Sequence, residues 1–153
     1  ALALVGNREF GKNYKPERLV LFALYHDMSE IITGDMPTPV KYHSEEMRKA
    51  YSVVEDTAGR TLLSMLPEDM RGTYEGAFFK KEEDEYLWKI VKAADKLSAL
   101  IKCIEETKAG NSEFEKALQS TEDSLRGMNI PEAEIFLQEF IGSFYLSLDE
   151  QNS

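Results

Sequence analysis

The sequence of 153 residues predicts an all-α protein, and two observations carry that prediction. Apolar residues recur at helical spacing over long segments, and no segment alternates between apolar and polar residues as a half-buried strand would. Glycine, proline and capping residues divide these segments where helices are expected to begin and end. Because neither an internal repeat nor a long linker interrupts the pattern, we expect residues 1–153 to form a single domain.

The first element expected is the end of an apolar helix. The run Ala1-Leu2-Ala3-Leu4-Val5 has no N-cap signal, and Gly6 is expected to close the helix as its C-terminal glycine. We therefore expect residue 1 to lie in the middle of a helix and not at its start. We expect the N-terminal part of the domain to be missing from this sequence.

The next helix is expected to begin at Pro16, which suits the first helical position, and to end at about Thr33 before Gly34. Its apolar residues point to nearly every side, which is typical of a central, buried helix. The prolines at 37 and 39 predict a loop after it.

A second long helix is expected to begin at Ser44, with acidic residues in its first turn, and to end before Pro67. A short turn of helix over residues 68–71 is expected next. Gly72 and Gly76 predict an irregular link after that turn.

The third long helix is expected over Glu83–Ala109, with Gly110 as its stop. Ser112 and Glu115 have the spacing of a capping box for a more polar helix that ends near residue 126. Pro131 is expected to open a last helix, which is rich in aromatic residues.

Composition excludes several classes of protein. The formal net charge is −10, with 28 acidic against 18 basic residues, which disfavours binding to a nucleic-acid polymer. The longest apolar runs, such as Leu19 to Leu24, are too short to span a membrane. The single cysteine, Cys103, has no possible disulfide partner within the chain, so we expect a cytoplasmic protein.

Three ionisable residues stand within the most apolar predicted helix: His26, Asp27 and Glu30. Ionised carboxylates are costly to bury unless they are paired or bind a metal. At helical spacing Glu30 lies on the same side as the His-Asp pair, and a mixed nitrogen and oxygen set suits a divalent cation. The alternative is a core histidine beside a helix-surface aspartate.

Asp95 is the second residue that departs from its surroundings. It lies beside the apolar stripe of the third long helix, next to small alanines that would let another helix approach. Taken alone, it is expected to form a salt bridge with Lys92 or Lys96, or to lie in solvent. Together with His26 and Asp27 from a crossing helix, it becomes a candidate third metal ligand.

Two blocks of sequence resemble those of bacterial HD-domain 5'-deoxynucleotidases. The first, YHDMSEIITGDMPTPVKY, covers Tyr25–Tyr42, and the second, KAADKLSALIKCIEE, covers Lys92–Glu106. Weaker similarity runs through Gly110–Phe114 and Ser143–Glu150. The resemblance therefore covers essentially the whole chain, and it implies an HD-domain helical bundle.

The resemblance implies a metal site and a proton-transfer residue. By analogy with the family, His26, Asp27 and Asp95 hold one divalent cation such as Co, Mn, Fe or Zn. Glu30 matches the residue that transfers a proton or orients the attacking water. A further histidine ligand and an Arg-Trp pair that holds the phosphate lie, in the family, upstream of anything in this chain. His43 matches no ligand position and is expected at the surface.

The resemblance also implies the substrate, a deoxyribonucleoside monophosphate that is cleaved to a deoxynucleoside and phosphate. The loop of Asp35, Met36, Pro37 and Thr38 matches the segment that contacts the sugar, and Asp35 matches the group that favours deoxyribose over ribose. Asp27 and Asp95 are expected at the substrate as well as at the metal. The family resemblance also implies a homodimer.

Three other interpretations stay open at this point. The chain could be an HD hydrolase of another nucleotide phosphoester, such as a cyclic nucleotide or an alarmone, although the loop from Asp35 to Pro39 argues against it. It could be a non-catalytic nucleotide-binding module. It could also be a helical scaffold whose aromatic last helix packs against a second subunit.

Overall fold

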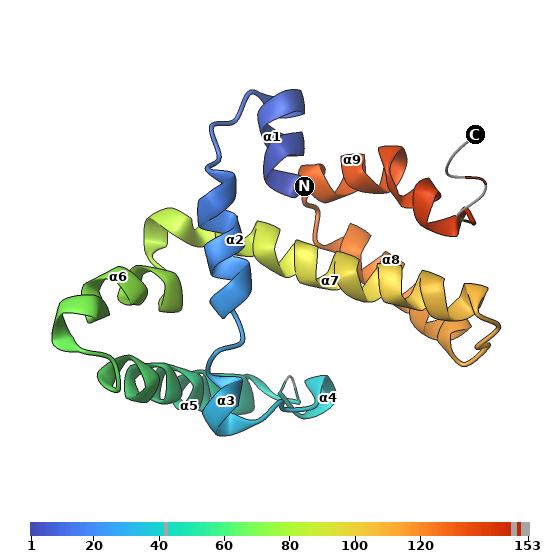
Figure 1. Ribbon diagram of the computed structural model, residues 1–153. Coiled ribbons are helices and arrows are strands. Elements are labelled where there is room, and N and C mark those ends of the chain that lie inside the picture. Colours follow the sequence, from blue (N-terminus) through green and yellow to red (C-terminus); the bar gives the residue numbers. More distant parts are fainter. Residues whose placement is uncertain (42, 148–149, 151–153) are drawn as a thin grey trace. The chain divides into compact units, whose positions relative to one another are not determined.

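The computed structural model describes residues 1–41, 43–147 and 150, and these residues form helices and turns with no strand (Figure 1). The all-α prediction is confirmed. The helices are α1 (Leu2–Phe10), α2 (Pro16–Tyr25), α3 (Glu30–Thr33), α4 (Thr38–Lys41), α5 (Glu45–Ser64), α6 (Glu68–Phe78), α7 (Glu85–Lys108), α8 (Phe114–Gly127) and α9 (Pro131–Glu139), with 3-10 turns at Glu82–Asp84 and Ile141–Tyr145.

The chain divides into two compact units. We call residues 1–19 and 86–153 the terminal unit and residues 20–85 the central unit. The chain passes between them within α2 and again at the start of α7. Whether residues 1–153 act as one domain stays a prediction. None of the helices in the described residues is both long and apolar enough to cross a membrane.

In the terminal unit, α1 runs through Gly6 and ends at Gly11, whose φ of 60° is left-handed. The expectation that Gly6 stops the helix is therefore wrong. Gly6 is buried, and a Cβ added there would lie 2.5 Å from Cε2 of Tyr14. This glycine permits a close approach of Tyr14 to the helix, whereas Gly11 supplies the turn.

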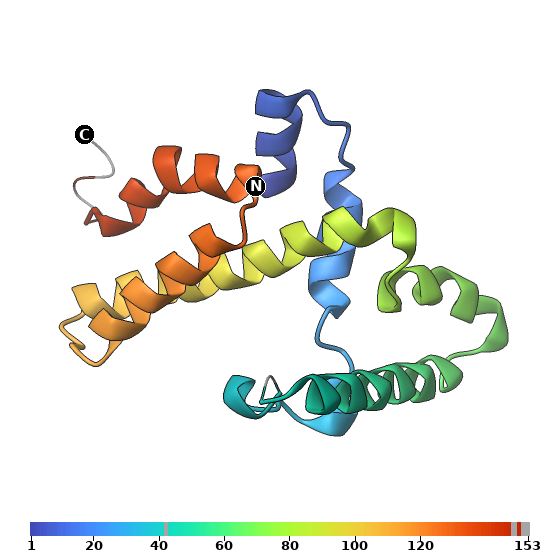
Figure 2. The ribbon, with the colours of Figure 1, turned by 180° about the vertical axis from the view of Figure 1, so that it is seen from behind.

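The same unit contains α7, and α8 turns back along it in both views (Figures 1 and 2). Gly110 ends α7 as predicted: its φ is 89°, and the N–H groups of Gly110 and Asn111 donate to the carbonyls of Thr107 and Glu106 at 3.0 Å each. The predicted capping box is wrong, because the N-cap of α8 is Glu113 and makes no side-chain cap hydrogen bond. Pro131 opens α9 as predicted.

The terminal unit also buries a carboxylate that sequence reasoning missed. Glu132 of α9 has 0% of its surface exposed. Its two carboxylate oxygens accept hydrogen bonds from the hydroxyls of Tyr14 at 3.1 Å and Tyr86 at 2.8 Å. The two tyrosine rings stack with their centroids 6.2 Å apart. One side chain therefore joins the segment after α1, the start of α7 and α9.

In the central unit, the helix predicted from residue 16 to residue 33 is broken after Tyr25. The chain continues through a turn at residues 26–29, in which the Glu30 N–H donates to the Asp27 carbonyl at 2.9 Å, and α3 follows. Asp27 and Ser29 favour such a break, because short polar side chains compete with helical hydrogen bonds.

The expectation that this segment is buried on nearly every side is also not met. Leu19 and Phe22 are buried, whereas Val20, Leu24 and Ile31 are 66%, 70% and 76% exposed. The break divides the apolar residues between two short elements, so they do not share one buried axis.

Helix α5 begins as predicted, with the Ser44 hydroxyl accepting a hydrogen bond from the Met47 N–H at 3.1 Å. Helix α6 is longer than predicted and includes both glycines that suggested an irregular link. Its Tyr74 and Phe78 pack against Tyr25, with ring centroids 5.9 and 5.3 Å away. We attribute the longer helix to this packing, which offsets the helix-breaking tendency of glycine.

The short α4 also departs from the predicted loop: Pro39 fits it because an N–H is not needed in a first helical turn.

Candidate functional site

The predicted pair His26 and Asp27 lies in the turn between α2 and α3, in the central unit. Nδ1 of His26 lies 2.7 Å from the carbonyl oxygen of Ala23, one turn back in α2. Nε2 of His26 lies 2.9 Å from Oδ2 of Asp27, and the two side chains are 24% and 55% exposed. The Asp27 side chain is therefore open to solvent, whereas the Nε2 atom of His26 is itself buried.

The contact with Ala23 assigns a proton to one nitrogen of the His26 ring. A carbonyl oxygen only accepts hydrogen bonds, so Nδ1 carries the hydrogen. In the neutral ring Nε2 then bears a lone pair, and it lies beside the Asp27 carboxylate, which is also an acceptor. Two acceptors at that distance require a shared proton or a cation. A backbone carbonyl that orients the ring through one nitrogen is usual for histidine metal ligands, so these residues fit a metal ion.

Glu30 opens α3 directly after this turn. Burial raises the pKa of its carboxyl group, the negative charges of Asp27 and Asp35 raise it further, and the positive charge of Lys41 lowers it. A carboxylate with a raised pKa accepts a proton more readily than an exposed glutamate does. The central unit thus brings Asp27, Glu30 and Asp35 close enough for their charges to interact, as the sequence predicted for Asp27 and Glu30.

The predicted sugar loop, Asp35 to Thr38, directly follows Gly34, whose φ of 69° and ψ of 167° are accessible almost exclusively to glycine. The Gly34 N–H donates to the Glu30 carbonyl at 2.9 Å, which ties the loop to the helix that carries Glu30. Asp35 and Pro37 are exposed, and Met36 is half-buried. Thr38 opens α4, and its side chain lies outside the described part of the structure.

Asp95 lies in the middle of α7, in the terminal unit. Its side chain is exposed, whereas Val91 and Leu97 of the same helix are buried, so it lies at the edge of the apolar stripe as predicted. Within the described residues of either unit alone, no three His, Cys, Asp or Glu side chains lie close enough together to hold a metal ion. The joint ligand set of His26, Asp27 and Asp95 stays a prediction. His43 is exposed, as expected.

Sequence reasoning missed Tyr51, which contacts Gly34 before the predicted sugar loop and Lys41 after it. Tyr51 of α5 is only 5% exposed, and its hydroxyl lies 3.3 Å from the Gly34 carbonyl oxygen. The ammonium group of Lys41 lies 4.8 Å from the centre of the Tyr51 ring and 2.7 Å from Oε1 of Glu55. A buried tyrosine hydroxyl needs a partner, but the sequence does not name it.

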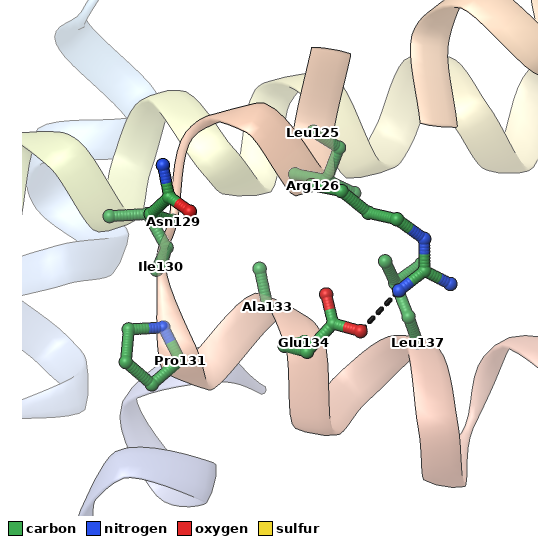
Figure 3. Close-up of a pocket in the computed structure, with 8 residues that line it drawn as sticks. All are labelled: Leu125, Arg126, Asn129, Ile130, Pro131, Ala133, Glu134 and Leu137. Atoms are coloured by element: carbon green, nitrogen blue, oxygen red, sulfur yellow. Dashed lines mark hydrogen bonds and ion pairs between the residues drawn. The ribbon is translucent and has the colours of Figure 1, made fainter. Parts of the chain in front are cut away.

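A separate hollow in the terminal unit does not resemble a phosphate site. It has a volume of about 370 Å³ and lies between the end of α8 and α9 (Figure 3). Arg126 on its rim forms ion pairs with Glu134 and, at 2.9 Å, with Glu122. This arginine is already neutralised by two carboxylates. The residues that line the hollow are Leu125, Arg126, Asn129, Ile130, Pro131, Ala133, Glu134 and Leu137.

Comparison with known protein families identifies the family to which the chain belongs. The family model described as 5'-deoxynucleotidase YfbR-like matches residues 1–144. The chain belongs to this YfbR-like family. A 5'-deoxynucleotidase of Vibrio parahaemolyticus is 46% identical to this member over 150 residues, which are 98% of the chain and 77% of the relative.

Two further relatives give the same result for this YfbR-like protein. A 5'-deoxynucleotidase of Photobacterium profundum is 45% identical over 152 residues, and one of Vibrio cholerae is 44% identical over 150 residues. Each match covers 98% of the chain and 77% of the relative. The resemblance predicted from the blocks Tyr25–Tyr42 and Lys92–Glu106 is confirmed, and both blocks lie within the region that the family model matches.

Proposed function

We propose that this YfbR-like protein hydrolyses the 5'-phosphate of deoxyribonucleoside monophosphates to a deoxynucleoside and inorganic phosphate. The observation that carries the proposal is the turn in which Nε2 of His26 faces the Asp27 carboxylate, next to a glutamate of raised pKa. Relatives named 5'-deoxynucleotidase, at 44–46% identity over nearly the whole chain, support the same substrate class.

The proposed cofactor is one divalent cation, such as Co, Mn, Fe or Zn, held by His26, Asp27 and Asp95. One imidazole and two carboxylates are a donor set that these ions accept. When bound, such a cation makes an attacking water more acidic and neutralises charge on the phosphoryl oxygens. The acidic residues explain why a cation is needed, because bare carboxylates would repel a phosphate dianion.

In this mechanism Glu30 transfers the proton. Its carboxylate takes a proton from the attacking water as the new P–O bond forms, and it gives a proton to the 5'-oxygen as the old P–O bond breaks. Burial and the charges of Asp27 and Asp35 raise the pKa of Glu30, which favours this role. His26 keeps Nε2 directed at the site because Nδ1 is held by the Ala23 carbonyl.

The loop of Asp35, Met36, Pro37 and Thr38 contacts the sugar in this proposal, and Asp27 and Asp95 also lie at the substrate. The charge of Asp35 acts on Glu30, which supports a position close to the reacting groups. We expect Asp35→Asn to lower the preference for deoxyribose over ribose about tenfold while changing turnover of the best deoxy substrate less. Comparison of kcat/KM for paired deoxy and ribo monophosphates measures this, and an unchanged ratio would contradict the role given to Asp35.

We also propose that the protein is a cytoplasmic homodimer. A buried cysteine without a disulfide, Cys103, suits a reducing compartment. Family resemblance supports the dimer, which light scattering on the purified protein tests directly.

The proposed function is tested by measuring phosphate release from deoxy and ribo monophosphates, cyclic nucleotides and an alarmone, with added divalent cations or with a chelator. We expect release from the deoxy monophosphates, and loss of it with the chelator and in His26→Ala. His43→Ala is the matched control, because it removes an exposed histidine outside the site. Full activity in His26→Ala, or with the chelator, would refute the proposal.

A further inference from the structure

Tyr51 contacts both ends of the segment from Gly34 to Lys41, although it belongs to α5. At the first end its hydroxyl lies 3.3 Å from the Gly34 carbonyl oxygen and 3.4 Å from Oγ1 of Thr33. At the second end its ring lies 4.8 Å from the ammonium group of Lys41. A single side chain therefore spans the base of the sugar loop.

The contact at the first end bears directly on Asp35. The Gly34 carbonyl and the Asp35 N–H belong to one planar peptide unit, so a bond that fixes the oxygen of Gly34 also fixes the nitrogen of Asp35. Glycine at position 34 allows many backbone conformations, and an external contact is needed to select one. The Tyr51 hydroxyl supplies it, together with Oγ1 of Thr33, which donates to the same carbonyl at 2.9 Å.

The contact at the second end holds the last residue of α4. Lys41 lies against the Tyr51 ring and 2.7 Å from Oε1 of Glu55, one turn further along α5. The Lys41 and Glu55 side chains are only 27% and 30% exposed, so this ion pair is partly shielded from solvent. An ammonium group held both by a ring face and by a carboxylate has little freedom to move.

We propose that Tyr51 is a positioning residue that fixes the loop of Asp35 to Thr38 and thereby sets the preference for deoxyribose. The proposal rests on the proposed function. It assigns to Tyr51 no contact with the substrate: the residue acts through the Gly34–Asp35 peptide and through Lys41. Sugar preference depends on a loop held in one conformation, because a misplaced polar group discriminates poorly.

The test compares three variants with the wild type. Tyr51→Phe removes the hydroxyl and keeps the ring beside Lys41. Glu55→Gln loosens the second end without changing side-chain size. Tyr74→Phe is the matched control, because it also removes a tyrosine hydroxyl from the central unit. The Tyr74 ring packs against Tyr25 and Phe78 and not against the loop.

We expect Tyr51→Phe to lower the ratio of kcat/KM for deoxy over ribo monophosphates by about threefold to tenfold, mainly through a higher KM for the deoxy substrate. Glu55→Gln changes the ratio in the same direction by less, and Tyr74→Phe leaves it unchanged. A merely structural tyrosine would lower the amount of folded enzyme, and so both substrates would lose the same factor. An unchanged ratio in Tyr51→Phe overturns the inference.

Amide hydrogen exchange separates the failure of this inference from the failure of the proposed function. The amides of Gly34, Val40 and Lys41 donate backbone hydrogen bonds, so their exchange can be followed. Faster exchange of these amides in Tyr51→Phe, and not in Tyr74→Phe, is expected whether or not the assay detects hydrolysis. Equal protection in Tyr51→Phe and the wild type overturns the positioning role. A wild-type chain inactive on every monophosphate would instead overturn the proposed function and the sugar-preference part of the inference.

Discussion

Each of the two units contains a glutamate whose surroundings are described above, and the two surroundings are opposite in kind. In the terminal unit, the Glu132 carboxylate is fully buried and accepts hydrogen bonds from the hydroxyls of Tyr14 and Tyr86. In the central unit, the charges of Asp27 and Asp35 act on Glu30 and raise its pKa, which burial has already raised. Glu132 is therefore surrounded by neutral hydrogen-bond donors, whereas Glu30 is surrounded by carboxylates that repel it.

The difference separates a structural role from a functional one. A buried carboxylate with two hydroxyl donors is satisfied as it stands, so it stabilises the fold and offers nothing to a ligand. Carboxylates that raise the pKa of a neighbouring carboxylate repel it, and binding of a proton or a cation relieves that repulsion. Glu132 is therefore expected to matter for stability, and Glu30 for chemistry.

The largest effect expected from this comparison is in Glu30→Gln. Loss of a proton-transfer group lowers kcat by about a hundredfold or more, whereas the free energy of unfolding should change little. Steady-state phosphate release and urea unfolding measure the two quantities. Glu17→Gln is the control, since Glu17 is an exposed acid in the first turn of α2. A Glu30→Gln variant that keeps the wild-type kcat would contradict the proton-transfer role of Glu30.

A second effect is expected in Glu132→Ala, which leaves two tyrosine hydroxyls without their acceptor and opens a cavity. We expect the free energy of unfolding to fall by about 3 kcal/mol, with no change in the deoxy-to-ribo ratio of the folded enzyme. Glu134→Ala serves as the control, because Glu134 of the same helix forms an exposed ion pair with Arg126 worth less than about 1 kcal/mol. An equal fall in the free energy of unfolding in the two variants would contradict the stabilising role given to the buried Glu132.

The smallest effect expected is a dependence on alkaline pH. Burial and the hydrogen bond to Glu132 raise the pKa of Tyr86 to about 12, and the same causes raise the pKa of Tyr14. The folded protein holds the tyrosine protons more tightly than the unfolded chain does, and this difference adds to the free energy of unfolding. The full contribution is present below the ordinary tyrosine pKa of about 10. That stability is lost as the pH rises through about 12.

Absorbance titration of tyrosinate in the wild type and in Glu132→Gln measures this effect. In Glu132→Gln the tyrosines lose an anionic acceptor, so we expect part of the titration to move to lower pH. Superimposable titration curves for the two proteins would contradict the pairing of Glu132 with the tyrosines.

Much of the fold could be predicted because it follows local rules. Ser44 caps α5, Gly110 ends α7 and Pro131 opens α9, and each effect depends on residues within a few positions. The errors arose where distant residues decide the outcome. Gly6 belongs inside a helix because Tyr14 packs against it, and α6 continues through two glycines that aromatic packing on Tyr25 offsets.

The residues of the candidate site were proposed from the sequence and stay a prediction, and part of their local geometry was missed. The types and spacing of His26, Asp27 and Glu30 indicated metal chemistry, and the charges of Asp27 and Glu30 do interact in the structure. The break in the helix after Tyr25 was missed, because apolar periodicity outweighed the turn tendency of Asp27 and Ser29. The role of Tyr51 was also missed, because its hydrogen bond to the Gly34 carbonyl joins residues that no local pattern relates.

The most direct test of the central claim is calorimetric titration of the purified chain with a divalent cation such as Mn²⁺, in the wild type, His26→Ala, Asp95→Ala and the control Asp69→Ala, which removes an exposed acid from α6. If His26, Asp27 and Asp95 form one site, the wild type and Asp69→Ala bind a single cation, and both His26→Ala and Asp95→Ala lose it. Binding of the cation by Asp95→Ala with wild-type affinity would contradict the shared site.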